Sequence, residues 1–285
     1  MPAVEMDNAM VRGLLETAVP TLSDYSVGFV LTTATNGLLD ANLGGSGTLV
    51  TIDEVRGILT ACHVVKRLST NKDVALVLPT ANKELHHISF RSSDFSHHSF
   101  CPQGEAANGP DVSLLVPPPD VLDTLQARKS FYNMSKRQER MLETPEPIEH
   151  GLWVLSGFAA ERTGDGVPEQ GFSKIKFFNG LHLNGKLARE CNEGNFDYLF
   201  FEALYNELYE GPDSYGGFSG GALWQLIIEP AGSKFQVTDI FLSGAAFFQS
   251  AKKDKGDGQV IRDIKCHGRR SLYKALIDKV CAEHR

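Results

Sequence analysis

Short runs of β-branched and other apolar residues recur along most of the chain, and glycine, asparagine, aspartate or proline separates them. The first half contains the runs SVGFVLTTA, GSGTLVTI, RGILTACHVV, DVALVLPT, HHISFRS and DVSLLVPP. The second half contains GLWVLSGFAAER, SKIKFF, FDYLFFEAL, GALWQLIIEP and FQVTDIFLSGAAFFQS. Short runs with turn residues between them are typical of the strands of a β-barrel or β-sandwich. The pattern therefore predicts an all-β fold.

Helical spacing replaces the strand pattern at both ends of the chain. Near the N-terminus, the apolar residues that share a helical face before Pro20 are Met6, Met10, Leu14 and Leu15. In the final segment, RRSLYKALIDKVCAEHR, the residues with this spacing are Leu272, Leu276, Ile277 and Val280. We therefore expect a short N-terminal helix that ends at Pro20 and a short C-terminal helix.

A polar segment separates the two β-rich halves. Residues 117–147 begin with three consecutive prolines, continue with QARKSFYNMSKRQER and close with two further prolines, a composition typical of a linker. A chain of 285 residues is long enough for one large domain or two small ones. The expected parts are 1–24 as an N-terminal helical extension, 25–116 as a first β-barrel, 117–147 as the linker, 148–250 as a second β-barrel, and 251–285 as a hairpin or loop with the C-terminal helix.

The charge of the chain argues against two classes of partner. Thirty-five acidic residues against 28 basic ones give a net charge of −7, so the positive field that binds a nucleic-acid backbone is missing. No window approaches the ~18 uncharged apolar residues of a membrane-spanning helix. We therefore expect neither a nucleic-acid nor a membrane partner.

The cysteines favour a reducing compartment. They are five in number and scattered, in a chain too large to need disulfide bonds for stability. Glu5 and Asp7 stand where a signal peptide would be basic, and no continuous apolar stretch follows them. We expect reduced thiols and a cytoplasmic location.

Three segments each place one reactive side chain beside small or apolar residues. ILTACHVV contains His63, GPDVSLLV contains Asp111, and YGGFSGGALW contains Ser219. A serine hydroxyl becomes a good nucleophile when an imidazole takes its proton, and the imidazole needs a carboxylate to fix its tautomer. The glycines around Ser219 let two backbone N–H groups turn toward one point, as an oxyanion hole requires. We expect those donors to be Gly217 and Ser219.

These motifs, in this order, resemble the trypsin-like serine peptidases of the chymotrypsin fold. ILTACHVV resembles the histidine segment of that family, DVSLL its aspartate segment, and GFSGGAL its Gly-Asp-Ser-Gly-Gly-Pro-Leu segment. The resemblance runs from about residue 25 to residue 249. It implies a double β-barrel with the active site between the barrels. It also implies peptide-bond hydrolysis through an acyl-enzyme, with a protein or peptide substrate and no cofactor or metal.

Two departures from the family pattern bear on regulation and on disulfides. Phe218 stands where secreted members have the aspartate that receives a newly cut N-terminus, so we expect the oxyanion loop to be ordered intrinsically or by a regulatory protein partner. Cys62 precedes His63, whereas the disulfide-forming cysteine of the family follows the histidine. The resemblance is therefore to intracellular members without disulfides.

The resemblance also implies candidate substrate-binding residues. Asp213 stands six residues before Ser219, where members that cleave after arginine or lysine carry an aspartate in the primary pocket. The same residue also fits an exposed turn, because GPDS is a common turn composition. The other candidates are Ser214 and three residues of the segment FLSGAAFFQ, which resembles the strand lining the substrate cleft: Gly244, Ala245 and Phe247.

Three alternatives remain. The serine segment also fits the G-x-S-x-G pattern of α/β-hydrolases, but only His267 and His284 follow it and the strands do not alternate with helices. A second group has zinc-compatible side chains whose spacing matches no common zinc pattern: His86, His87, His97, His98 and Cys101. The chain could also be a catalytically inactive peptidase homologue that binds peptides or serves as a scaffold.

Overall fold

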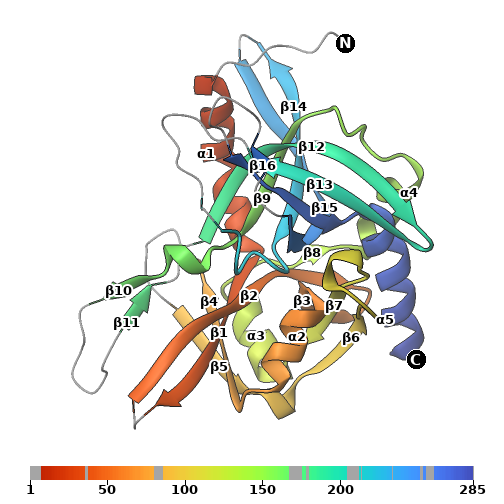
Figure 1. Cartoon of the computed structure of the whole chain (residues 1–285). Coiled ribbons are helices and arrows are strands. Elements are labelled where there is room, and N and C mark those ends of the chain that lie inside the picture. The colour runs from red at the N-terminus through yellow and green to blue at the C-terminus, as the bar shows by residue number, and fades with distance from the viewer. Residues whose placement is uncertain are drawn as a thin grey trace.

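The strands of the first half form one sheet, which the computed structural model shows below the second half in Figure 1. In spatial order the strands are β5 (His86–Arg91), β4 (Asp73–Leu78), β1 (Ser26–Thr35), β2 (Leu38–Ile52), β3 (Val55–Thr60), β7 (Val112–Val116) and β6 (Ser96–Phe100). A short strand, β8 (Tyr132–Asn133), pairs in parallel with β2. All other pairings in this sheet are antiparallel. The structure describes residues 8–35, 38–79, 86–166, 175–177, 180–203, 212, 214–232, 234–250, 253–254 and 260–284.

The strands of the second half close into a barrel. Its order is β12 (Gly180–Glu193), β13 (Phe196–Ala203), β18 (Asp263–His267), β15 (Lys234–Gln249), β14 (Ala222–Ala231) and β9 (Leu152–Phe158), which pairs again with β12. Two small hairpins lie outside it: β10 (Gly164–Gly166) with β11 (Ile175–Phe177), and β16 (Lys253–Asp254) with β17 (Val260–Ile261). The mostly β architecture is as predicted. Only the second half is closed by hydrogen bonds, because β5 and β6 do not pair with each other among the described residues.

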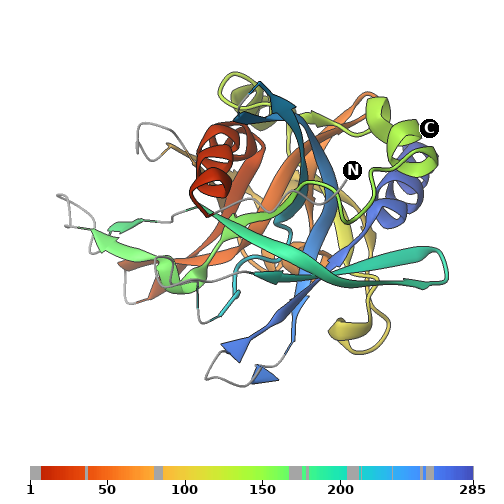
Figure 2. The same ribbon diagram turned by 90° about the horizontal axis from the view of Figure 1, so that it is seen from above.

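Helices cover the ends and the connection of the two halves. The α-helices are α1 (Asn8–Asp24), α2 (Cys62–Ser69), α3 (Pro119–Gln126), α4 (Gln138–Glu143) and α5 (Ile277–Glu283), the last preceded by a π-helical segment η5 (Ser271–Leu276). Short 3-10 turns are η1 (Ser92–Asp94), η2 (Ala106–Asn108), η3 (Ser135–Arg137) and η4 (Ala160–Arg162). Figure 2 shows α1 and the C-terminal helix on opposite sides of the molecule. In the described part of the chain, no helix has the length and apolarity needed to cross a membrane.

The N-terminal helix continues through Pro20, so the predicted end at this residue is wrong. Proline removes one helical hydrogen bond and clashes with the preceding turn. The ring of Pro20 is exposed, whereas Ala18 and Leu22, two residues before and after it in the sequence, are buried in a core that includes residues of both halves. Packing of this apolar face stabilises the last turn of α1 despite the lost hydrogen bond.

One apolar cluster joins the two halves. It contains residues of α1, of the first sheet, of the barrel and of the C-terminal helix. At its centre the rings of Tyr25, Tyr132 and Trp224 pack with centroids 5.5 to 5.7 Å apart. Because both halves bury side chains in one core, this packing holds the two halves together.

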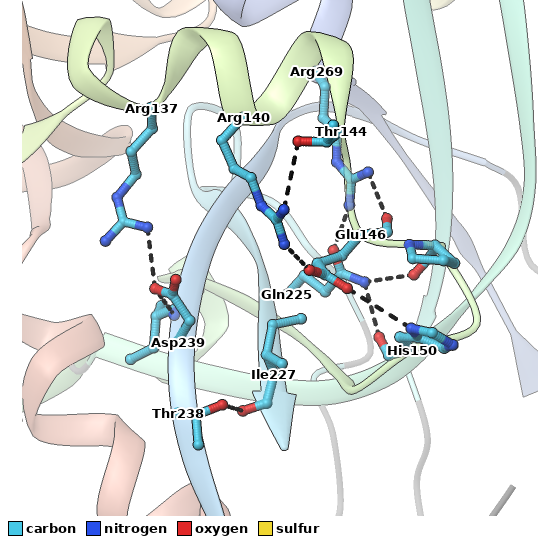
Figure 3. A network of polar contacts seen from close by, with 12 residues as sticks. Arg137, Arg140, Thr144, Glu146, His150, Gln225, Ile227, Thr238, Asp239 and Arg269 are labelled. Carbon is cyan, nitrogen blue, oxygen red and sulfur yellow. Dashed lines mark hydrogen bonds and ion pairs between the residues drawn. The ribbon is translucent and has the colours of Figure 1, made fainter. Parts of the chain in front are cut away.

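The segment predicted as a linker is folded onto the barrel (Figure 3). The half-buried Arg269, which follows β18, donates to the carbonyl oxygen of Glu146 at 2.7 Å and also to the amide oxygen of Gln225. Gln225 on β14 in turn donates to the carbonyl oxygens of Pro147 and His150, each at 2.8 Å. These bonds fix the end of the segment to one wall of the barrel.

Candidate active site

His63 and Asp111 form a two-point contact beyond the end of β3 and the start of β7, two neighbouring strands inside the first sheet. Oδ2 of Asp111 lies 2.6 Å from Nδ1 of His63, and Oδ1 accepts the backbone N–H of His63 at 2.9 Å. The Asp111 side chain is fully buried, whereas 42% of the His63 side chain is exposed. The buried carboxylate therefore fixes both the backbone and the ring of the histidine, and the rest of the imidazole faces outward.

Strand register brings these two residues together. Strand β3 pairs antiparallel with β7, with Thr60 opposite Ser113. Extended by two residues, this register places Asp111 beside Cys62 at the start of α2. The chain leaves β3 through Ala61, which has extended backbone angles, and then enters the helix. His63 thus lies in the first turn of α2, where its N–H has no helical acceptor and is free to bond Asp111.

A second histidine, His267, binds the backbone of Asp111. Nε2 of His267, the last residue of β18, accepts the backbone N–H of Asp111 at 2.9 Å. The His267 ring is fully buried and packs on Phe247 with centroids 4.6 Å apart. Burial lowers the pKa of His267 to about 3, so the ring is neutral at pH 7 and can accept this bond. Sequence reasoning did not assign this role to His267, because no local motif surrounds it.

Ser219 lies in a glycine turn just before β14. The turn has positive φ at Gly217 (+99°) and Gly220 (+88°), values that favour glycine. A Cβ at Gly220 would lie 2.0 Å from the carbonyl oxygen of Ser46 and 2.9 Å from Cα of Thr60. The turn therefore packs directly against the end of β3, the strand that leads to His63.

Gly45 provides a second link between the serine turn and the histidine helix. A Cβ at this position would lie 2.7 Å from a methyl group of Val64 and 3.3 Å from the carbonyl oxygen of Ser219. Val64 follows His63 directly, so the structure brings the backbone of Ser219 into the neighbourhood of the histidine. No hydrogen bond joins the Ser219 hydroxyl to His63 among the described residues. Bonds of this kind are often long before substrate binds.

Two backbone N–H groups in the turn are held in place with no acceptor of their own. The carbonyl oxygen of Gly216 accepts the N–H of Ala160 at 2.8 Å, and that of Phe218 accepts the N–H of Gly221 at 2.7 Å. Because a peptide group is planar, each bond also fixes the N–H of the next residue, Gly217 or Ser219. Neither N–H has a hydrogen-bond partner in the described part of the chain. Both are therefore available to a ligand.

Ser46 on β2 holds the same turn through two hydrogen bonds and joins it to β9 through a third. Its N–H donates to the carbonyl oxygen of Ser219 at 2.8 Å, and its hydroxyl donates to that of Gly217 at 2.7 Å. The hydroxyl also accepts the N–H of Phe158 at 2.8 Å. The sequence motif GSGTLV contains Ser46, but only the three-dimensional contact shows what this serine binds.

The predicted substrate-binding residues fall into two groups. Ser214 lies at the start of the serine turn, where its N–H donates to Glu161 at 3.0 Å and its hydroxyl accepts the N–H of Gly216 at 3.2 Å. Gly244, Ala245 and Phe247 are buried on β15. Their contact with substrate stays a prediction. Asp213 lies outside the described residues.

The expectation of five reduced thiols is wrong. Cys62 and Cys101 form a disulfide, with Cα atoms 5.4 Å apart, which ties the start of α2 to the chain after β6. The bridged cysteine directly precedes His63 in the sequence, whereas in the family pattern the disulfide-forming cysteine follows the histidine. A separation of 39 residues gives no local signal for this pairing. Cys191, Cys266 and Cys281 are not in a disulfide. The cytoplasmic location, which rested partly on reduced thiols, stays a prediction.

The histidine cluster offers no described metal site. Nδ1 of His98 bonds Glu283 on α5 at 2.7 Å, and Nδ1 of His97 bonds Ser99 at 2.7 Å. Cys101 is in the disulfide. The side chains of His86 and His87 lie outside the described residues. Within the rest, no group of three or more potential ligands is placed to hold a metal ion.

Comparisons with known proteins give only distant structural similarity. No protein-family profile and no curated protein matches the sequence. The solved structures that resemble this chain include the Rv3671c protease in an inactive form, with 14% identity, a TM-score of 0.33, and coverage of 84% of this chain and 93% of that one. A mutant of the tobacco etch virus protease has 11% identity and a TM-score of 0.39, over 90% of this chain and 80% of that one. The catalytically active tobacco etch virus protease in complex with product has 11% identity and a TM-score of 0.37, over 86% of this chain and 73% of that one. Scores of this size do not establish a shared family or activity.

Proposed function

We propose that the chain is a serine endopeptidase of trypsin-like type, with Ser219 as nucleophile, His63 as general base and acid, and Asp111 as the residue that orients His63. The two-point contact between the buried Asp111 carboxylate and His63 carries the proposal. A carboxylate without solvent on one side of an imidazole is an arrangement that stabilises a positive charge on the ring. Such a charge forms when His63 takes the proton of Ser219.

The proposed reaction has two stages. The Ser219 hydroxyl attacks the scissile carbonyl, His63 takes its proton, and the carbonyl oxygen becomes an oxyanion. The N–H groups of Gly217 and Ser219 stabilise this oxyanion, and the loss of one such donor costs roughly 10² to 10³ in kcat in a comparable site. His63 then gives its proton to the leaving amine, and the acyl-enzyme remains for water to hydrolyse. No cofactor enters these steps.

A preference for cleavage after arginine or lysine is the finer part of the proposal. It rests on Asp213 and its spacing from Ser219. A carboxylate in a pocket discriminates strongly, because a neutral substrate side chain would leave it desolvated and unpaired. Profiling a peptide library with wild type and Asp213→Ser tests this. Cleavage after arginine or lysine that collapses in the variant supports the assignment, and cleavage after apolar residues in both refutes it.

One observation favours a second function. Because no hydrogen bond joins Ser219 to His63 among the described residues, the second candidate is a catalytically inactive homologue that binds peptides beside the same residues. The two functions differ in turnover. A regulatory partner that completes the Ser219–His63 contact would reconcile them.

The test is hydrolysis of an unfolded protein substrate by wild type and by three variants: Ser219→Ala, His63→Ala and Asp111→Asn. The triad acts as one unit, so we expect each variant to lose at least roughly 10³-fold in rate, with Asp111→Asn the mildest. Circular dichroism of each variant controls for folding. Substantial turnover by Ser219→Ala contradicts the proposal, and peptide binding without any turnover by wild type favours the inactive homologue.

A further inference from the structure

An open pocket of about 460 Å³ lies beside the serine turn. The pocket is lined by residues 41–43 in the first half of β2, by α2, by the chain after β9 and by the serine turn. The described residues that matter here are Asn42, Leu43, Arg67, Thr163, Gly216 and Gly217. Gly217 carries one of the two N–H groups without an acceptor. Successive Cα atoms are about 3.8 Å apart, so a side chain in this pocket belongs to a residue next to the scissile bond or one position further.

Arg67 supplies the charge of this pocket. It lies one helical turn after His63 on α2, and residues spaced by four share a face of a helix. The opposite face of α2, with Val64, Val65 and Leu68, is buried in the core of the first half. Arg67 is exposed, and no described side chain pairs with its guanidinium. Arg67 is also the single charged residue among the described residues that line the pocket.

We propose that Arg67 binds an acidic side chain of the peptide substrate, from a residue next to the scissile bond or one position further. This inference rests on the proposed peptidase function and adds a substrate class to it. A guanidinium offers paired N–H donors that match both oxygens of a carboxylate. An aspartate or glutamate in the pocket would gain these bonds, whereas a lysine or arginine would meet a like charge.

The experiment compares peptides that differ only in charge. Aspartate and glutamate are exchanged for asparagine and glutamine at each of the three positions on either side of the scissile bond, with both peptide ends blocked. The proteins are wild type, Arg67→Ala, Arg67→Glu and Lys66→Ala. Lys66 is the matched control, because it is an exposed cation on the same helix that does not line the pocket.

We expect wild type to favour the acidic peptide at one position by roughly tenfold in kcat/KM, the ratio expected for a hydrogen bond to a charged group. Arg67→Ala loses this preference, Arg67→Glu favours lysine or arginine at the same position, and Lys66→Ala keeps the wild-type ratio. Turnover that depends on Ser219 but shows no acidic preference, or a preference that survives in Arg67→Ala, overturns the role of Arg67 and leaves the peptidase function intact. Absence of turnover that depends on Ser219 overturns both.

Discussion

Replacing Ser46 with alanine should weaken the serine turn and the fold together. The hydroxyl of this buried serine donates to the carbonyl oxygen of Gly217 and accepts the N–H of Phe158. Alanine would leave the Gly217 carbonyl and the Phe158 N–H without this hydrogen-bond partner. Each buried polar group without a partner costs about 1 to 3 kcal/mol. Because Gly217 is only half-buried, its carbonyl can gain a water molecule, so the total should be about 2 to 4 kcal/mol. Urea unfolding of wild type and Ser46→Ala measures this difference.

Thr48 offers a matched control on the same strand. It lies two residues along β2, on the same face, and is fully buried, but its hydroxyl has no hydrogen-bond partner among the described residues. Thr48→Val removes an unpaired polar atom, so stability should stay within about 0.5 kcal/mol of wild type or rise by up to about 1 kcal/mol. A Ser46→Ala protein that loses no more stability than Thr48→Val would refute the anchoring role of Ser46.

Two further predictions concern the surroundings of the site. Cys62→Ala combined with Cys101→Ala should lower the free energy of unfolding by about 4 kcal/mol, the chain-entropy value for a loop of this length; urea unfolding that gives the same stability with and without the bridge contradicts it. His267 should make stability depend on pH, since its pKa is about 3 in the folded chain and about 6.5 in the unfolded one. Its contribution is complete above pH 6.5 and is lost by about 1.4 kcal/mol per pH unit toward pH 3. His267→Asn should lower the slope of stability against pH by this amount and leave the contribution of His182, whose pKa is lowered to about 4 by burial. An unfolding series over successive pH values with an unchanged slope contradicts the assignment.

The sequence predicts the strands well, because alternation and turn residues act over a few positions. The buried run before His63 and the run after Asp111 became the neighbouring strands β3 and β7, and the long run ending at Gln249 became β15. The predicted C-terminal helical face is buried, including Leu272 and Val280. These elements bury the side chains that define their pattern, so local sequence and tertiary packing agree.

The errors have long-range causes. Pro20 predicts a helix end from local sequence, but Leu22 packs in a core whose other residues are distant in sequence. This packing stabilises the helix beyond Pro20. The pairing of Cys62 with Cys101 depends on the position of β6 next to β7, which no spacing rule contains. Contacts between segments that are distant in sequence decide both outcomes: core packing for the helix and strand pairing for the disulfide.

The candidate site shows the same division. Motifs identify His63, Asp111 and Ser219, because reactive side chains stand beside glycine and apolar residues in a known order. Ser46 and His267 hold these residues from other strands and carry no local motif of their own. Sequence therefore yields the residues expected to react, whereas the residues that position them come from the fold.

The most direct test of the central claim is intact-protein mass spectrometry after treatment with a fluorophosphonate, which phosphonylates an activated serine. We expect one adduct per wild-type chain, located on Ser219 by peptide mapping. The adduct should be absent from Ser219→Ala and should form far more slowly on His63→Ala and Asp111→Asn. A wild-type chain that stays unmodified, or an adduct that forms at the same rate on His63→Ala, would contradict activation of Ser219 by the His63–Asp111 pair.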